Sequence, residues 1–463
     1  MGLNACELEL DFKKGANKWS QKGVFFTGTG LQAEKISKDA VSAYLKERKA
    51  EDSKAFETAN GVFREIESRG FDAISDFTRK FDRMEITGEN IKVPQSELAS
   101  AEKALSNDER VAILEMIRRV RKFALAQRKT MGPVSVKGAD GTTKLVFKPV
   151  GTVGIYVPAG LAPLFSSLVM AAVPAQAAGV ENIIVCTPPK ASADASRLIY
   201  ATASMCGIKN VYRIGGAQAV FAMALGIDGL MPKADVICGP GNSYVSAAKQ
   251  IAQSMAGARI DVPAGPSEVL VIADRTANPS YVAADMLAQA EHGTGSAAIC
   301  ICTSKEMADC VIAELDSQLG KLPESSPAKV SIPKWGRVWI AASIDKAIGA
   351  SEKIAPEHLE LAVVGAGKYA GKISNAGAVF IRTAEAFCDY GMSGGNHILP
   401  TGVAAKAWGG VSVQTFGKWQ YVEMLNAKAQ DRLAKTCARL ARMEGLEAHA
   451  RAAEKRAKNP GNK

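Results

Sequence analysis

The sequence predicts an α/β protein in which parallel strands alternate with helices, preceded by a helical region and followed by a helical tail. Short apolar runs bounded by Gly and Pro alternate with helical stretches through the middle of the chain, which is typical of parallel sheets that bind ligands at the carboxyl ends of their strands. The 463 residues are 47% hydrophobic and 22% charged, so the chain can bury a large core, which excludes a disordered or disulfide-stapled protein.

The pattern along the chain predicts the individual elements. Residues up to about Gln32 are polar and weakly patterned, which indicates an N-terminal arm. Apolar residues at three- and four-residue intervals then predict three helices, at Ala33–Lys49, Ala55–Phe81 and Asp108–Gln127. The predicted strands are Gly154–Val157, Asn182–Cys186, Asn210–Ile214, Val236–Cys238, Glu268–Ala273, Ala297–Cys302, Val338–Ile340, Leu359–Val364 and Ala378–Ile381. After about Val411 the pattern predicts helices to the end, with a frayed terminus at Asn459-Pro460-Gly461.

The charge balance bears on possible partners. The formal net charge is +10, from 57 Lys and Arg against 47 Asp and Glu, and much of the excess lies in the last stretch. Basic residues at helical spacing among Ala and Leu are typical of a solvated helix face. A basic nucleic-acid-binding protein is the alternative, but the aromatic residues needed for base stacking are missing from this stretch. We therefore expect no nucleic-acid partner.

The sequence also indicates a cellular location. The longest apolar stretch, from Leu161 to Val180, is interrupted by Pro163 and Pro174, so we expect no membrane span. The first residues lack the basic and apolar blocks of an export signal. The nine cysteines are scattered without a Cys-x-x-Cys pair, which favours reduced thiols in the cytoplasm.

Three glycine-containing segments are candidates for a close approach to a ligand. Residues 28–33 fit a G-x-G-x-x-A dinucleotide pattern, but only a short apolar segment precedes them and helices follow, so we interpret them as a turn leading into a helix. The loops Gly215-Gly216-Ala217-Gln218 and Gly239-Pro240-Gly241-Asn242 each follow an apolar strand. At such places the backbone either passes close to a ligand or turns sharply, and the loops alone leave both alternatives open.

Two of the four histidines lie in motifs with clear chemistry. Gln289 and His292 share one face of a predicted helix, which suits two ligands of one metal ion. Glu357 and His358 stand side by side at a strand entrance, as an acid/base pair whose members could act on different protons.

The other two histidines also have polar neighbours. Asp389 and His397 bracket a glycine-rich loop, and Glu444 precedes His449 by five residues. A structural role explains any one of the four histidines, but not all four together. Nitrogen and oxygen ligands of this kind suit zinc, whereas nothing supports a cysteine-rich structural zinc site.

Seven longer motifs occur in order along the chain: Val153-Gly154-Ile155-Tyr156-Val157-Pro158, Gly215-Gly216-Ala217-Gln218-Ala219, Gly239-Pro240-Gly241-Asn242, Pro263-Ala264-Gly265-Pro266-Ser267-Glu268-Val269-Leu270, Gln289-Ala290-Glu291-His292-Gly293, Glu357-His358-Leu359-Glu360-Leu361 and Asn396-His397-Ile398-Leu399-Pro400-Thr401. With these motifs the chain resembles the histidinol dehydrogenase family from about Ala33 to His449.

The resemblance implies specific site residues. It implies one zinc ion per subunit, held by Gln289, His292, Asp389 and His449. It implies NAD contacts at Tyr156, Gln218 and Asn242. It implies contacts to the substrate L-histidinol at Ser267, Gln289, His292, His358, Asp389, His397, Glu444 and His449.

The family fold implied by the resemblance consists of two incomplete Rossmann-like domains and an intertwined homodimer whose carboxyl tail completes the neighbour's site. We accordingly expect an N-terminal arm at 1–32, a discontinuous domain with the metal and catalytic residues at 33–155 and 267–411, an inserted NAD-binding domain at 156–266, and a helical dimerisation tail at 412–463.

The resemblance also implies a mechanism. Histidinol is oxidised to histidine through a held aldehyde with two NAD+, where His358 takes the hydroxyl proton and serves both oxidations, and Glu357 activates the water that attacks the aldehyde.

The sequence departs from the family pattern in three places. Asp389 stands eight residues before His397 where the family usually has seven, the segment after Tyr156 reads Pro158-Ala159-Gly160, and the residues near Trp419-Gln420-Tyr421 are unusual. A paralogue in the same fold that oxidises another small hydroxylated compound, such as a sulfonated diol, is therefore the alternative function.

Overall fold

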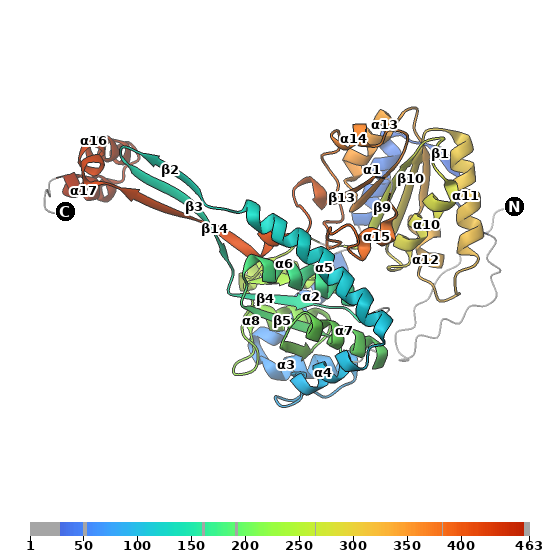
Figure 1. Cartoon of the computed structure of the whole chain (residues 1–463), viewed down its shortest axis with the longest axis horizontal. Coiled ribbons are helices and arrows are strands. Elements are labelled where there is room, and N and C mark those ends of the chain that lie inside the picture. Colours follow the sequence, from blue (N-terminus) through green and yellow to red (C-terminus); the bar gives the residue numbers. More distant parts are fainter. Residues whose placement is uncertain are drawn as a thin grey trace.

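A computed structural model describes residues 28–49, 53–159, 163–189, 193–263, 265–381 and 383–457. These residues form two α/β units, each built on a parallel sheet, and a long projection that extends away from them (Figure 1). Most of the expected N-terminal arm, the expected frayed end at Asn459-Pro460-Gly461, and Gly160 lie outside the described residues. Among the described helices, none combines the length and the apolar character needed to cross a membrane.

The first unit is built on a six-stranded sheet with the order β1-β11-β10-β9-β12-β13, in which all paired strands are parallel. The strands are β1 (Ala33–Lys35), β9 (Glu268–Ala273), β10 (Ala297–Cys302), β11 (Arg337–Ile340), β12 (His358–Ala362) and β13 (Ala378–Ile381). β9 and β10 are buried at every residue, because helices cover both faces of the sheet.

Helices on the two faces of the six-stranded sheet bury alternate residues of its strands. Val269 and Val271 of β9 pack with α10 (Pro279–Ala290), α11 (Lys305–Leu319) and α12 (Ala328–Trp335). Leu270 and Ile272 pack on the other face with α1 (Lys38–Lys49) and α13 (Ile344–Ile354). This division follows the period of two of a strand. The short elements α14 (Gly367–Ala370), α15 (Glu385–Asp389) and η3 (Ala404–Lys406) belong to the later connections.

The second unit is built on a five-stranded parallel sheet with the order β6-β5-β4-β7-β8. Its strands are β4 (Thr152–Tyr156), β5 (Asn182–Thr187), β6 (Asn210–Arg213), β7 (Val236–Cys238) and β8 (Arg259–Ile260). One face packs on α2 (Ser53–Arg69), α3 (Phe71–Phe77), α8 (Gly216–Leu225), α9 (Ser243–Ile251) and η2 (Ala252–Ala256). The other face packs on α4 (Gln95–Lys103), α5 (Asn107–Thr130), α6 (Phe165–Ala178), α7 (Ala193–Met205) and η4 (Val413–Phe416).

The helical region differs from the sequence-based expectation in two respects. Residues 33–35 form the edge strand β1 rather than the start of a helix. The helix expected over 55–81 is broken at Gly70, whose φ is +55°, into α2 and α3, and α3 continues directly into the π-helical turn η1 (Thr78–Asp82). In addition, α2 to α5 pack on the five-stranded sheet, whereas the domain bounds expected from the sequence join them to residues 267–411. An amphipathic stripe shows that a helix covers a core, but it does not show which of two sheets forms that core.

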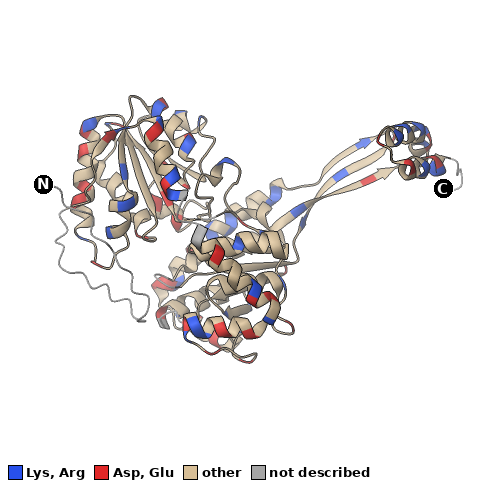
Figure 2. Ribbon diagram, turned by 180° about the vertical axis from the view of Figure 1, so that it is seen from behind, with Lys and Arg blue, Asp and Glu red and all other residues tan. Residues whose placement is uncertain are grey.

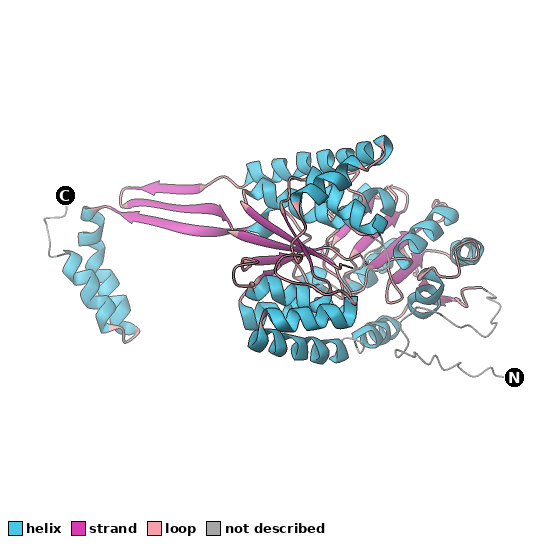
Figure 3. Cartoon of the chain, turned by 90° about the horizontal axis from the view of Figure 1, so that it is seen from below, coloured by secondary structure: helices cyan, strands magenta, loops and turns pink. Residues whose placement is uncertain are grey.

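The projection consists of an antiparallel three-stranded ribbon that carries two helices at its end (Figures 1 and 3). The ribbon has the order β14-β3-β2, with β2 (Val134–Gly138), β3 (Gly141–Pro149) and β14 (Gly417–Leu425), and the helices are α16 (Ala427–Met443) and α17 (Glu447–Ala457). The expectation that the chain is helical after Val411 is therefore wrong for β14, and the hairpin β2–β3 was not expected at all. Apolar residues exposed on both sides of a free ribbon leave no simple alternation to recognise.

The two units contact each other through the loop after α15 of the first unit and the start of α6 of the second. Both sheets share one topology: numbered along the chain, β4 to β8 and β9 to β13 each follow the order 3-2-1-4-5. The loop after α15 reaches the second unit, where His397 Nε2 lies 3.0 Å from Ser167 Oγ near the start of α6 and Asn396 Nδ2 donates to the carbonyl of Met170. Because α6 follows β4, the contact brings the carboxyl edge of the five-stranded sheet to the residues around α15.

Candidate active site

The residues expected to perform chemistry gather at the amino edge of the six-stranded sheet. His358 is the first residue of β12, Glu357 precedes it, and Ser267 directly precedes β9. α10 runs back from the opposite edge, so Gln289 in its last turn and His292 just after it also lie at the amino edge. The expected catalytic and metal-binding residues thus lie at the opposite end of this sheet from the carboxyl ends of the strands, where the sequence pattern predicts ligands.

His358 is a buried histidine held by a carboxylate. Its Nδ1 lies 2.8 Å from Oε1 of Glu385, and the two side chains are 3% and 0% exposed. Its Nε2 is buried with no hydrogen-bond partner in the described chain and lies 4.0 Å from Oδ1 of Asp389. When Nδ1 donates to Glu385, Nε2 becomes the acceptor and can take a proton from a group placed before it. Burial, followed by the charge of Asp389, holds the pKa of Glu385 well above its ordinary range.

Glu357 lies beside His358 but points to different partners. Its Oε2 accepts a hydrogen bond from the backbone N–H of Glu268 at 2.9 Å, and the side-chain amide of Gln289 lies 3.3 Å away. Burial raises the pKa of Glu357 to about 8, and the charge of Glu268 adds to this rise. Glu268 is itself buried and paired with Arg48 of α1, at 3.3 Å. Glu357 and His358 can therefore handle different protons, because their reactive atoms have separate surroundings.

Asp389 is the residue on which the cluster converges. Its Oδ2 lies 3.5 Å from Nε2 of His292, and its Oδ1 faces His358. Although burial opposes its charge, His292 and His358 hold the pKa of Asp389 below its ordinary value. His358, Glu385 and Asp389 each offer a ligand atom, and these atoms lie within 4.8 Å of one another. The contacts of Asp389, at 3.5 and 4.0 Å, are long for hydrogen bonds, and nitrogen and oxygen donors gathered in this way could share an ion.

The loop between Asp389 and His397 accommodates the extra residue found there. Gly391 and Gly394 have φ of +64° and +88°, conformations that glycine adopts without strain, and the N–H of Gly394 donates to the carbonyl of Gly391. The loop then returns to α15, because Nδ1 of His397 contacts the backbone carbonyl of Asp389. Both ring nitrogens of His397 are thus engaged, with Asp389 and with Ser167. Asp389 is placed in the cluster despite the longer loop.

The residues expected to contact NAD lie at the carboxyl edge of the five-stranded sheet. Tyr156 ends β4, and its hydroxyl accepts a hydrogen bond from the N–H of Gly216 at 3.1 Å. Gln218 is buried in the first turn of α8, and Asn242 caps α9 by accepting from the N–H groups of Tyr244 and Val245. β4 and β7 are the neighbours between which the strand order reverses, which is where open α/β sheets bind ligands.

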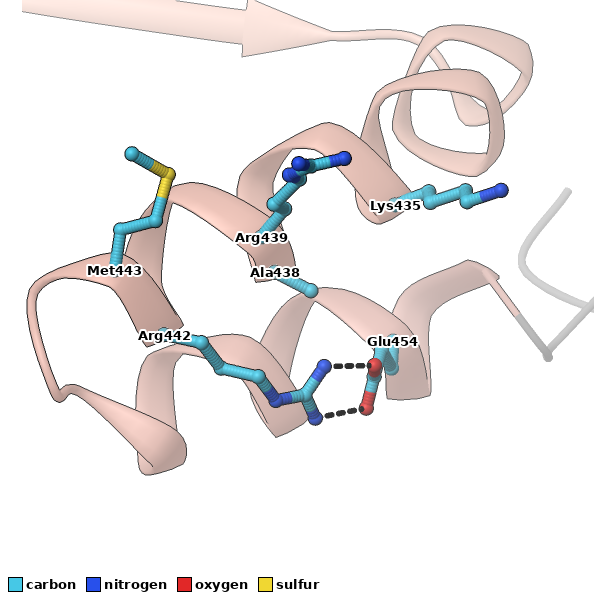
Figure 4. Close-up of a pocket in the computed structure, with 6 residues that line it drawn as sticks. All are labelled: Lys435, Ala438, Arg439, Arg442, Met443 and Glu454. Atoms are coloured by element: carbon cyan, nitrogen blue, oxygen red, sulfur yellow. Dashed lines mark hydrogen bonds and ion pairs between the residues drawn. The ribbon is translucent and has the colours of Figure 1, made fainter.

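Two expected site residues, Glu444 and His449, lie elsewhere in the chain. Both are exposed on the helical end of the projection, in the loop after α16 and in α17, and neither joins the cluster around Asp389 within one chain (Figure 1). Figure 4 shows how this end is held together: Arg442 of α16 forms two hydrogen bonds to Glu454 of α17 across a shallow pocket, at 2.8 and 3.2 Å. The buried apolar residues at this end are small alanines such as Ala438, Ala441 and Ala450.

Three of the basic residues on the projection pair with acidic neighbours. Figure 2 shows Lys and Arg along the ribbon and at its helical end, with acidic residues among them. Arg432 pairs with Asp140 of the ribbon, and Arg442 and Arg451 both pair with Glu447. These pairs fit the interpretation of the basic tail as a solvated helix surface.

Glu385, Glu268 and Ser167 are site residues that the sequence analysis missed. Glu385 stands one helical turn before Asp389, so the spacing of four residues within α15 is a signal that could have indicated it. Glu268 and Ser167 act through contacts between segments distant in the sequence, and no local pattern marks them.

Comparisons with known proteins agree on one family. The family model described as histidinol dehydrogenase matches residues 45–457. Proteins named histidinol dehydrogenase from Xanthomonas euvesicatoria pv. vesicatoria (strain 85-10) and Escherichia coli (strain K12) are 38% and 37% identical to this chain, covering 84% and 85% of it and 89% of each relative. The crystal structure of histidinol dehydrogenase from Elizabethkingia anophelis is 39% identical, has a TM-score of 0.81, and covers 87% of this chain and 92% of that chain.

Proposed function

We propose, on the premise that the chain belongs to the histidinol dehydrogenase family of oxidoreductases, that it oxidises L-histidinol to L-histidine through L-histidinaldehyde with two NAD+. The observation that carries this proposal is the buried pair of Glu357 and His358 beside Asp389. Two oxidations with a hydration between them need one group for the alcohol proton and one for the water, and the pair supplies both.

His358 acts as the base of each oxidation in this proposal. Its buried Nε2 takes the hydroxyl proton while the hydride leaves for the nicotinamide, and Glu385 holds Nδ1 so that the resulting charge is stabilised. Glu357 takes a proton from the water that adds to the aldehyde. The hydrogen bond from the Glu268 N–H fixes one of its oxygens and leaves the other for this transfer.

A zinc ion fits the residues at this site. The donor set is mixed nitrogen and oxygen, and the carboxylate of Asp389 faces Nε2 of His292 at 3.5 Å and Nε2 of His358 at 4.0 Å. Gln289, His292, Asp389 and His449 would hold one zinc per subunit, and the bound ion would supply a fixed point that orients the substrate. His449 would have to come from another chain, because it lies on the projection.

NAD binding is assigned in the proposal to the five-stranded unit. The strand order 3-2-1-4-5 is that of part of a doubly wound, Rossmann-like sheet, and Tyr156, Gln218 and Asn242 lie along its switch point. The contact between Ser167 and His397 brings this edge to the catalytic cluster, so a cofactor here would face the substrate.

The projection supports a homodimer with shared sites. Its ribbon and helices expose large apolar side chains, including Val136 (67%), Tyr421 (69%) and Met443 (76%). A monomer rarely exposes such residues together on one free element, whereas an element exchanged between two subunits buries them. The exchanged helices would carry Glu444 and His449 to the partner's cluster. We also propose a cytoplasmic enzyme, in keeping with the biosynthetic family.

The stoichiometry of the reaction tests the proposed function. With zinc-loaded protein and limiting L-histidinol, about two NADH should form per histidinol, together with histidine. His358→Ala should form neither product. Formation of NADH from a sulfonated diol, without turnover of histidinol, would favour the paralogue. Formation of only one NADH per histidinol, with the aldehyde as product, would contradict the role of Glu357.

A further inference from the structure

The most deeply buried ion pair near the expected cofactor edge joins Lys249 of α9 to Asp261 just after β8. The Lys249 and Asp261 side chains are 2% and 0% exposed, and Nζ of the lysine contacts Oδ1 of the aspartate. Neither residue belongs to the catalytic cluster, and the mechanism above does not use either. Their burial requires an explanation, because two charges removed from water cost more than their attraction readily returns.

Both partners of this pair hold the same peptide segment. Oδ2 of Asp261 accepts the hydrogen bond of the Gly239 N–H at 2.8 Å, and Nζ of Lys249 donates to the Gly239 carbonyl at 3.1 Å. Oδ1 of Asp261 also accepts from the N–H of Val262 at 2.7 Å. The ion pair thus fixes the peptide planes on both sides of Gly239, the residue that directly follows β7 and begins the loop to Asn242.

Gly239 is held in a conformation that few other residues could adopt. Its φ is +124°, and a Cβ at this position would lie 2.1 Å from the carbonyl oxygen of Tyr156. The loop therefore packs directly against the end of β4, beside the tyrosine expected to contact the cofactor. Three residues later Asn242 caps α9, so the orientation of Gly239 also sets the direction of the helix start.

We propose that Lys249 and Asp261 are positioning residues for the nicotinamide cofactor, which hold the 239–242 loop in the conformation that receives it; this rests on the proposed NAD site. Both side chains bind the backbone of the loop at Gly239, and neither contacts the cofactor itself. Neutral residues of similar shape would satisfy the packing of the core, but they would not fix both peptide planes of Gly239 with charge-assisted hydrogen bonds.

The test compares wild-type protein with the double variant Lys249→Met, Asp261→Asn. The double variant leaves no unpaired buried charge, and this gain should offset the loss of the Lys249 hydrogen bond to the buried Gly239 carbonyl, so its thermal midpoint should stay close to that of wild type. The KM for NAD+ and the Kd for NADH should rise roughly tenfold or more, because two charge-assisted hydrogen bonds to the loop are lost or weakened. The kcat at saturating NAD+ and the KM for histidinol should stay within about twofold.

Lys233→Met serves as the matched control. Nζ of Lys233 also donates to a backbone carbonyl, that of Ala256, but Lys233 is exposed and precedes β7 at the opposite edge of the sheet. This variant should keep wild-type NAD+ affinity. If the double variant does not fold, Lys249→Arg keeps the charge but displaces the donor, and it should raise the KM for NAD+ without changing that for histidinol.

Three outcomes would show whether the positioning role of Lys249 and Asp261 is wrong or whether the proposed function itself is wrong. Wild-type NAD+ affinity in the double variant, or in Lys249→Arg when that variant is used, would overturn the proposal. A parallel loss of thermal stability, NAD+ affinity and histidinol affinity would also overturn it, because it would show a general structural role. A wild-type protein that binds no nicotinamide cofactor would instead contradict the proposed function.

Discussion

Replacing Glu357 by Gln in the metal-free protein should change how stability depends on pH. Burial raises the pKa of Glu357 to about 8 in the folded protein, against an ordinary value of 4.5. The folded state therefore keeps its proton through a pH range in which the unfolded chain has lost it. The stability associated with this proton is fully present below about pH 4.5 and is lost as the pH rises through about 8. Gln does not titrate, so the unfolding free energy of Glu357→Gln should not fall in this way as the pH rises.

The size of the effect follows from the two pKa values. They differ by about 3.5, and each pKa unit corresponds to about 1.4 kcal/mol, so wild type should lose on the order of 5 kcal/mol relative to Glu357→Gln. The side chain is only 7% exposed, so solvent reduces this value little. Glu360, whose pKa burial raises to about 9, contributes equally in both proteins and cancels from the difference.

Urea denaturation at about pH 5 and about pH 9 measures this difference. The gap in unfolding free energy between Glu357→Gln and wild type should widen in favour of the variant at the higher pH. The exposed Glu89 provides a control, because Glu89→Gln should track wild type at both values. Added zinc should narrow the gap, since a nearby cation favours the carboxylate. A gap that does not change with pH would refute the assignment of a raised pKa to Glu357.

Three further predictions concern the catalytic cluster. Glu385→Gln should lower kcat by about 100-fold without lowering the thermal midpoint, because an amide cannot ionise to balance the charge of protonated His358, while the variant also removes a buried carboxyl; unchanged turnover would contradict that role. His292→Ala and His449→Ala should each lose most bound zinc in elemental analysis, because three ligands hold the ion less well than four, and one zinc per subunit in both variants would exclude the proposed site. Glu357→Gln should block formation of the acid while added aldehyde is still reduced by NADH, whereas His358→Ala should impair both directions; equal loss of aldehyde reduction would argue against separate roles.

The sequence predicted the central strands of both sheets because buried parallel strands are continuous apolar runs, but it missed the short edge strands β1 and β8. β9 and β10 occupy the residues expected for them, from Glu268 and from Ala297. The packing partners of α2 to α5 and the strand β14 could not be predicted, because both depend on contacts with segments far away in the chain. The local residue pattern indicates whether a segment is a helix or a strand, but it gives less information about the segment on which that helix or strand packs.

The candidate site shows the same division. Gln289 and His292 could be paired from their spacing on one helix, and Glu357 and His358 from adjacency. The convergence of Asp389 on these residues came only from the resemblance and is placed in three dimensions by α15 and its return loop. Glu385 escaped notice because a glutamate one turn from an aspartate is common on exposed helices.

Subunit mixing tests most directly the central claim, that the active site combines the body of one chain with the projection of another. His358→Ala and His449→Ala subunits, each inactive alone, should regain about a quarter of wild-type activity per total subunit when they exchange, because half of the dimers are mixed and each of these has one intact site. Exchange is confirmed separately with two differently tagged subunits. No recovery of activity in a preparation shown to contain mixed dimers would contradict the claim, because each chain would then complete its own site.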